Sequence, residues 1–409
     1  MKEIVLFRNK SRHSTSGLQM ETIDKDSLRQ LDNHLAASHQ SWLFGAGISV
    51  EANIPLMYPL TNRIFNLSGV KGYEKTLNVL TEVRKELPEN AHIEHILSHL
   101  GDLATLAERA KSKKSRIGKI AVELNEIRTV HAQVLDWIAE TIRWGYTEAK
   151  EGVPEVVGTR SIPIIKISSH LQFMSAIYNR AQAGMTERRG ALKFFTTNYD
   201  TLLEDALALG SFSYWDGFSG GAVAFRSHAY GKSEPERGFR AHVIKLHGSI
   251  DWHLDSTDRI WRVRDGDKYL DSPTRVLIYP QSTKYFATQH DPFAAQFELL
   301  RNTLCSVSEN VLAICGYSFG DEHINQEIEL ALRRSDNKTT ILAFTKTVGD
   351  VLRRWQSEHW SKRLFVIASD GLYVGASGPH FQSSASPHDW WTFNGAAKLL
   401  SSGAEACVL

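Results

Sequence analysis

The chain has 409 residues, of which 42% are hydrophobic and 23% charged, and its formal net charge is +1. This length predicts two domains, or one domain with a large insertion. The balanced charge argues against a broad positive surface that would attract nucleic acid or membranes. Direct nucleic-acid binding therefore stays open only through a local basic patch. Three cysteines without a CxxC pair exclude a disulfide framework and a zinc site of four cysteines.

The sequence also lacks the patterns of exported and membrane-spanning proteins. The first 17 residues carry charges throughout and have no long apolar core, unlike a secretory signal. No run of about 18 apolar residues occurs. We therefore expect a cytoplasmic protein without membrane contact.

The first predicted element is a short strand, Ser41–Phe44, which ends at the turn Gly45-Ala46-Gly47. A helical pattern follows from about Pro55 to Leu67. Glycines let a backbone approach a phosphate closely, and a following helix offers free N–H groups. Because Val50 stands where a dinucleotide fingerprint wants a third glycine, a plain strand-to-helix turn is an equal alternative.

A change of pattern sets residues 71–189 apart from the rest. Apolar residues lie three and four apart in Ile93–Ala107, Ile120–Trp144 and Ile165–Ala183, which is typical of amphipathic helices. Strand patterns are nearly absent. We predict a mostly helical insertion or subdomain.

Two polar features of this insertion leave their roles open. His92, His95 and His99 fall on one predicted helix face, and a polar face over a ligand cleft explains them better than a metal site. The basic run at residues 109–119 fits a solvated helix end, with a nucleic-acid or partner-docking role as the minority interpretation.

Short apolar strands return after the insertion and alternate with helical patterns. This alternation predicts an α/β fold with a Rossmann-like, doubly wound parallel sheet. The expected domains are an N-terminal extension (1–40), a Rossmann-like domain (41–70 and 190–370), the helical insertion (71–189) and a C-terminal tail (371–409). The later predicted strands are Leu192–Phe195, His242–Leu246, Arg275–Tyr279, Val311–Cys315, Thr340–Phe344 and Arg363–Ile367.

Ligands of such sheets bind beyond the carboxyl ends of the strands. Four loops should therefore share one rim: Gly45–Ser49, Thr196–Asp200, Leu246–Asp251 and Gly316–Asp321.

Each loop carries residues suited to a ligand, and each has a simpler alternative. Asn198 offers a donor and an acceptor, although Asn198 or Asp200 could merely cap the helix Thr201–Leu209. His247 can exchange a proton near neutral pH. The glycines and serine of the fourth loop suit ribose or phosphate, or form only a turn.

The segments GAGIS, TTNYD, KLHGSIDW and GYSFGD, in this order, resemble the sirtuin superfamily and above all the bacterial sirtuin-like NAD hydrolases of anti-phage defence. The resemblance covers about residues 40–70 and 190–370 and implies a sirtuin-like NAD-binding domain there. It implies that Asn198, Asp200 and His247 are catalytic, with His247 as the base. The nucleotide-binding residues that it implies are Gly45, Ala46, Gly47, Ser49, Thr197, Asn198, Asp200, Gly316 and Ser318.

Two departures separate the chain from the protein deacylases of that superfamily. Their IPDFR segment has no counterpart, since Leu56-Met57-Tyr58 follows Ile54-Pro55, and the two zinc-binding CxxC pairs are missing. We therefore expect NAD to be hydrolysed to nicotinamide and ADP-ribose, without a metal. A deacylase or ADP-ribosyltransferase, and a non-catalytic module that senses NAD or ADP-ribose, stay as alternatives, and cyclisation is not excluded.

The resemblance also implies control by another protein, because an unrestrained NAD hydrolase would exhaust the host's cofactor. We expect the sheet to end near Asp370, which leaves Gly371–Leu409 too short for a sensor domain. We predict a homo-oligomer built through the insertion and the tail, weakly active alone and switched by a HerA-type ATPase or, as a lesser alternative, a short Argonaute. The trigger and the oligomer size are not predicted.

Overall fold

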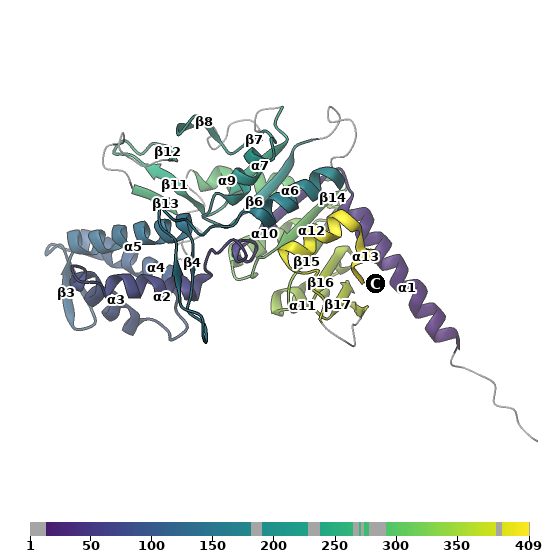
Figure 1. Cartoon of the computed structure of the whole chain (residues 1–409), viewed down its shortest axis with the longest axis horizontal. Helices are drawn as coiled ribbons and strands as arrows, with labels where there is room; N and C mark the ends of the chain where they lie inside the picture. The colour runs from purple at the N-terminus through teal and green to yellow at the C-terminus, as the bar shows by residue number, and fades with distance from the viewer. Residues whose placement is uncertain are drawn as a thin grey trace, which may run out of the picture.

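A nine-stranded sheet runs through the middle of the computed structural model, which describes residues 14–180, 190–227, 238–264, 270, 274–277, 292–381 and 387–408 (Figure 1). The strand order is β18-β17-β16-β15-β14-β1-β6-β10-β7. The strands are β1 (Gln40–Phe44), β6 (Leu192–Thr196), β7 (Tyr214–Trp215), β10 (Ala241–Lys245), β14 (Asn310–Cys315), β15 (Thr339–Phe344), β16 (Leu364–Ala368), β17 (Gly371–Val374) and β18 (Ser377–His380).

The sheet is mostly parallel and is wound in both directions from β1. Strands β7, β10, β6, β1, β14, β15 and β16 pair in parallel, whereas β17 and β18 are antiparallel additions at one edge. The predicted α/β class is confirmed, and six of the seven predicted strands lie in this sheet. Because the chain continues from β1 to one side and returns to β14 on the other, the switch point lies between β1 and β14.

Helices cover both faces of this sheet because its strands are apolar on both sides. Along β1, Trp42 and Phe44 point to one face and Leu43 to the other, as the two-residue period of a strand requires. The first face packs against α1 (Ser14–Leu35), α6 (Ser168–Arg180), α7 (Leu202–Leu209) and α12 (Phe393–Ser402). The second packs against α9 (Phe293–Leu304), α10 (Glu322–Leu332) and α11 (Asp350–Gln356).

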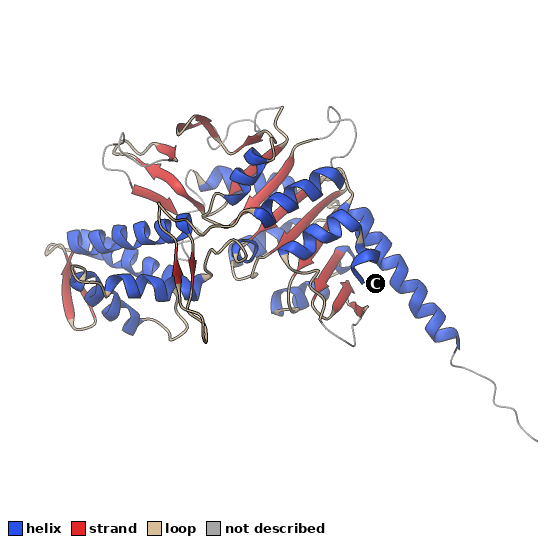
Figure 2. Ribbon diagram, in the orientation of Figure 1, coloured by secondary structure: helices blue, strands red, loops and turns tan. Residues whose placement is uncertain are grey.

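The region between β1 and α6 forms a helical group with its own core (Figure 2). Two small hairpins, which the sequence pattern did not predict, accompany the helices. The helix predicted from Ile120 begins at Leu124, because residues 120–123 pair with 114–117. The elements are α2 (Met57–Ser68), α3 (Glu74–Glu86), α4 (Ile93–Arg109), α5 (Leu124–Trp144), β2 (Lys114–Ile117), β3 (Ile120–Glu123), β4 (Tyr146–Thr147) and β5 (Val156–Val157).

A second, five-stranded sheet lies above the helical group, in the order β13-β11-β12-β9-β8. The parallel placement predicted for Arg275–Tyr279 is wrong, since β13 pairs antiparallel with β11, and residues 278 and 279 lie outside the described part. The predicted loop Leu246–Asp251 is also wrong from Gly248 onward, where β11 begins. The strands are β8 (Phe218–Gly220), β9 (Val223–Arg226), β11 (Gly248–Leu254), β12 (Ile260–Val263) and β13 (Thr274–Leu277).

The C-terminal segment belongs to the main fold. The expected end of the sheet near Asp370 is wrong, because β17 turns back antiparallel against β16. Trp390 is buried and its indole N–H donates to the Ala368 carbonyl at 2.6 Å. α12 then packs against α6, and α13 (Ala404–Val408) packs against α1. Among the helices that the structure describes, none is both long and apolar enough to cross a membrane.

Candidate functional site

A cavity of about 710 Å³ opens at the carboxyl ends of β1, β6, β10, β14 and β15. Loops from both sides of the switch point line it, as the topology of a doubly wound sheet requires. All ten residues that the sequence predicted for the site lie in its wall. They are Gly45, Ala46, Gly47, Ser49, Thr197, Asn198, Asp200, His247, Gly316 and Ser318.

The two glycine-rich loops touch each other backbone to backbone. Gly45 N–H donates to Cys315 O at 3.1 Å, and Gly47 N–H donates to Gly316 O at 2.9 Å. A Cβ atom at Gly45 would lie 2.6 Å from Gly316 O, and one at Gly47 would lie 2.8 Å from Gly316 Cα. These glycines therefore serve close packing between loops. Their N–H groups already have acceptors, so they are not free to hold a phosphate.

A chain of hydrogen bonds joins the loops after β1 and β6. Ser49 Oγ accepts from Asn198 Nδ2 at 3.1 Å and donates to Asp200 Oδ2 at 2.8 Å. Asp200, which precedes the N-cap residue Thr201, accepts the N–H of Leu202 at the start of α7 through its Oδ1 at 3.0 Å. One aspartate thus holds both the helix and the serine.

Asn198 leaves one polar atom unused. The residue is 7% exposed, and no donor within the described part of the chain reaches its Oδ1. A buried amide oxygen without a partner costs free energy unless a ligand or water completes it. Because Asn198 lines the cavity, this oxygen is a candidate contact for a bound hydroxyl group.

A buried ion pair between Lys245 and Glu204 lies beside the loop after β6. The Lys245 ammonium donates to the Asp200 carbonyl and lies 3.4 Å from Glu204 Oε1. Burial raises the pKa of Glu204 to about 7, and the charge of Lys245 opposes that rise. Burial lowers the pKa of the His170 imidazole to about 4, and the charge of Asp200 opposes this shift. The side chain of Lys245, at the end of β10, thus holds the backbone of Asp200 in place.

His247 lies in the short connection between β10 and β11, and it faces the loop after β14. Its Nε2 lies 3.9 Å from Asp321 Oδ1, a distance for electrostatic attraction when the imidazole is protonated. Its ring lies over that of His323, with centroids 5.6 Å apart and planes at 25°. His247 and Asp321 line the cavity, whereas His323 does not belong to its wall.

Several parts of the cavity wall were not predicted. Thr345 and Lys346 follow β15, and applying the strand-end rule to that predicted strand would have found them. Trp391–Phe393 come from the C-terminal segment, and Leu56–Tyr58 come from the start of α2. No local pattern marks these two segments, because their position depends on how distant elements pack.

The helical group also contributes, through the start of α4. Glu94 lines the cavity, and its Oε1 accepts from the hydroxyl of Tyr199 at 2.9 Å. His92 lines it too, as the N-cap residue of α4, and the centroid of its ring lies 4.1 Å from that of His95. His99 contacts Glu86 at 2.6 Å. The insertion thus closes one side of the cavity.

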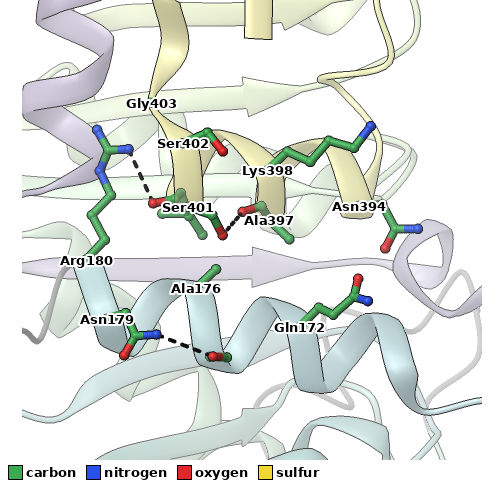
Figure 3. A pocket seen from close by; sticks show the side chains of 12 residues that line it. Gln172, Ala176, Asn179, Arg180, Asn394, Ala397, Lys398, Ser401, Ser402 and Gly403 are labelled. Atoms are coloured by element: carbon green, nitrogen blue, oxygen red, sulfur yellow. Dashed lines mark hydrogen bonds between the residues drawn. The ribbon is translucent and has the colours of Figure 1, made fainter. Parts of the chain in front are cut away.

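A second cavity, of about 820 Å³, lies between α6 and α12 (Figure 3). Arg180 lies at one end of this cavity and donates to the Leu400 carbonyl at 3.3 Å. It also donates to the Leu399 carbonyl at 2.7 Å. Its wall consists of the outer sides of two helices and includes none of the four predicted loops. The strand-end cavity is therefore the better candidate for chemistry.

Residues 192–364 match the family model of the SIR2-like domain. The match spans fewer than half of the residues and includes Asn198, His247 and Gly316, but not the glycine loop after β1.

Two solved structures are also similar to the chain, each at low identity. One is a crystal structure of a SIR2 homolog in complex with NAD, with 12% identity, a TM-score of 0.38, and coverage of 80% of this chain and 90% of that chain. The other concerns the structural basis of sirtuin substrate affinity, with 13% identity, a TM-score of 0.32, and coverage of 77% and 86%. No curated protein matches the sequence.

Proposed function

We propose that the chain binds NAD in the strand-end cavity and hydrolyses its nicotinamide–ribose bond, giving nicotinamide and ADP-ribose. The observation that carries this proposal is the unpartnered Asn198 Oδ1, buried in the same cavity wall as His247. The match of residues 192–364 to the SIR2-like domain supports NAD as the ligand. The cavity volume lies within the range of known small-molecule sites.

The residues of the cavity divide the chemistry between them. The bond from ribose C1′ to the cationic nicotinamide nitrogen breaks, and its electron pair neutralises that nitrogen. Asn198 Oδ1 accepts a hydrogen bond from a ribose hydroxyl or from water. The water oxygen bonds to C1′ while His247 accepts its proton. Asp200 holds Ser49 and through it the amide of Asn198.

The phosphates need donors other than Gly45 and Gly47, whose N–H groups are bonded within the protein. Lys346 supplies a positive charge at the wall of the cavity. We assign Lys346 to the pyrophosphate, in place of the amides of Gly45 and Gly47. Ser318 and Gly316 are proposed to contact the nucleotide from the other side.

Product analysis tests the proposal directly. Chelator-treated full-length protein is incubated with NAD, and nicotinamide, ADP-ribose and cyclic ADP-ribose are separated by chromatography. We expect nicotinamide and ADP-ribose in equal amounts, and little of either from Asn198→Ala. Turnover only with an acylated peptide would indicate a deacylase, and tight NAD binding without turnover would indicate a sensor. Either result contradicts the proposal.

For the control of this activity, we propose that the chain forms a homo-oligomer that is weakly active alone. A partner such as a HerA-type ATPase switches it on, and the resulting depletion of NAD serves anti-phage defence. Exposed apolar side chains on the segment around β4 and β5 support assembly. They are Val153, Val156, Val157 and Ile162. Light scattering measures the oligomeric state, and nicotinamide release measures the activity of the protein alone. A monomer at micromolar concentration with full turnover and no partner would contradict this proposal.

A further inference from the structure

Three side chains with metal-binding atoms meet at one corner of the strand-end cavity. His247 follows β10, Asp321 ends the loop after β14, and His323 lies in the first turn of α10. One ligand atom from each residue lies within 4.8 Å of the other two. They are up to 76 positions apart in the sequence, so no spacing motif marks the group.

The donor set suits a transition metal. Two imidazole nitrogens and one carboxylate bind Zn²⁺ in many proteins, at about 2.0–2.2 Å per bond. Bonds of that length place tetrahedral ligand atoms roughly 3.4 Å apart. The 3.9 Å between His247 Nε2 and Asp321 Oδ1 is already near that value. The other two distances are at most 4.8 Å, so these atoms must approach each other by no more than about 1.4 Å.

Two hydrogen bonds hold the loop after β14, which carries Asp321, in place beside α10. The Tyr317 hydroxyl donates to the Asp321 carbonyl at 3.1 Å, and Asn325 Nδ2 donates to Phe319 O at 2.8 Å. Both bonds tie the loop after β14 to α10. The Asp321 side chain is 18% exposed and lines the cavity, so an ion can enter from there.

We propose that His247, Asp321 and His323 form a binding site for a divalent transition-metal ion, Zn²⁺ foremost, with a fourth position open to the cavity. This differs from the four-cysteine site that the sequence excludes, and it replaces the expectation that no metal binds. Its consequence rests on the proposed function: a metal on His247 Nε2 removes the atom that accepts the proton. Zinc therefore inhibits NAD hydrolysis reversibly.

Calorimetry on the full-length, chelator-treated protein tests the site itself, with ZnCl₂ as the probe. We expect one strong site per chain, which His323→Ala weakens at least tenfold and which His359→Ala, a change of an exposed histidine, leaves intact. Because Zn²⁺ has no visible absorption, Co²⁺ takes its place as the spectroscopic probe of the same site. We expect visible absorption bands of tetrahedral Co²⁺ in the wild type and in His359→Ala, but not in His323→Ala.

Turnover then tests the consequence. We expect zinc to inhibit the wild type and a chelator to restore it, whereas the turnover of His323→Ala, measured relative to its own metal-free rate, resists zinc. Zinc affinity and cobalt bands that His323→Ala leaves unchanged would overturn the site. Because these readouts need no NAD, they decide the metal site even if the protein proves not to hydrolyse NAD.

Discussion

Asn198 donates its side-chain amide to Ser49 Oγ over 3.1 Å, which joins two loops that are 149 residues apart in the chain. The same serine donates to Asp200 at 2.8 Å. The helical insertion lies between these loops in the sequence but not in space, because β1 and β6 are neighbours in the sheet. The orientation of Asn198 therefore depends on correct pairing of these two strands.

Asn198→Ala and His247→Ala should each abolish most NAD turnover. Loss of a general base commonly removes about 10²–10⁴ of the rate, and loss of Asn198 removes the proposed ribose and water contact. Nicotinamide release measures the effect, and the melting temperature shows that the fold persists. His359→Ala serves as the control. Near-normal turnover of His247→Ala with an unchanged melting temperature would exclude His247 as the base.

Ser49→Ala should lower kcat more than it raises KM. Without Oγ, the amide of Asn198 and one oxygen of Asp200 lose their shared partner, at a cost of about 1–3 kcal/mol in stability. The matched control is Ser68→Ala, whose buried hydroxyl donates only to Phe65 O in its own helix. Equal kcat values for the two variants would show that Ser49 has no positioning role.

Much of the main sheet was predictable because its strands are short, apolar and bounded by polar or glycine turns. The β6 strand and the loop Thr197–Asp200 are an example, since both the strand and its carboxyl-end residues were predicted nearly to the residue. The strand-end rule then placed residues from four distant segments in one wall, where the structure also has them. This success relies on local patterns combined with one topological rule.

The errors arise where partners far along the chain decide the structure. Residues 274–277 pair with β11 in a separate antiparallel sheet, and nothing in their sequence distinguishes that from a parallel edge. Gly371–Val374 extends the main sheet only because it folds back on β16. The close contact of the glycines after β1 with Gly316 also could not be predicted, because it depends on the pairing of β1 with β14.

Gly45→Ala should destabilise the protein and weaken NAD binding together. The added Cβ would lie 2.6 Å from Gly316 O and from Tyr317 Cα, both backbone atoms, so the two loops must separate. Overpacking of this kind costs about 1–3 kcal/mol. Gly349→Ala is the control, because nothing lies within 4 Å of its added Cβ. Chemical denaturation gives the stability and calorimetry the NAD affinity. Equal stability of the two variants would contradict the close-packing role.

Lys346→Ala should raise the KM for NAD with little change in kcat, since the proposed phosphate contact lies away from the reacting bond. Ser369 holds the Lys346 carbonyl by its N–H at 3.2 Å and by its hydroxyl at 2.7 Å, so the backbone should keep its place. The effect should shrink at high salt, because screening weakens exposed charges. Lys338→Ala, at another exposed lysine, is the control. A KM that does not change would remove Lys346 from the site.

The last prediction concerns acid stability and the imidazole of His170. This buried ring lies against Phe393, with centroids 4.9 Å apart, and neither ring nitrogen has a partner within the described part of the chain. Burial lowers the pKa of His170 from 6.5 to about 4, and the nearby charge of Asp200 opposes the shift. Below pH 6.5 the unfolded chain therefore binds a proton that the folded chain does not.

The free energy of unfolding should consequently fall as the pH falls from 6.5 toward 4. His170 alone should account for about 2 kcal/mol at pH 5 relative to pH 7.5. His131 and His242, whose pKa values burial also lowers to about 4, act in the same direction. Urea denaturation at both pH values should show a loss about 2 kcal/mol smaller in His170→Leu than in the wild type. The exposed control His359→Gln should behave like the wild type, and an equal loss in His170→Leu would mean that this ring is protonated in the folded protein.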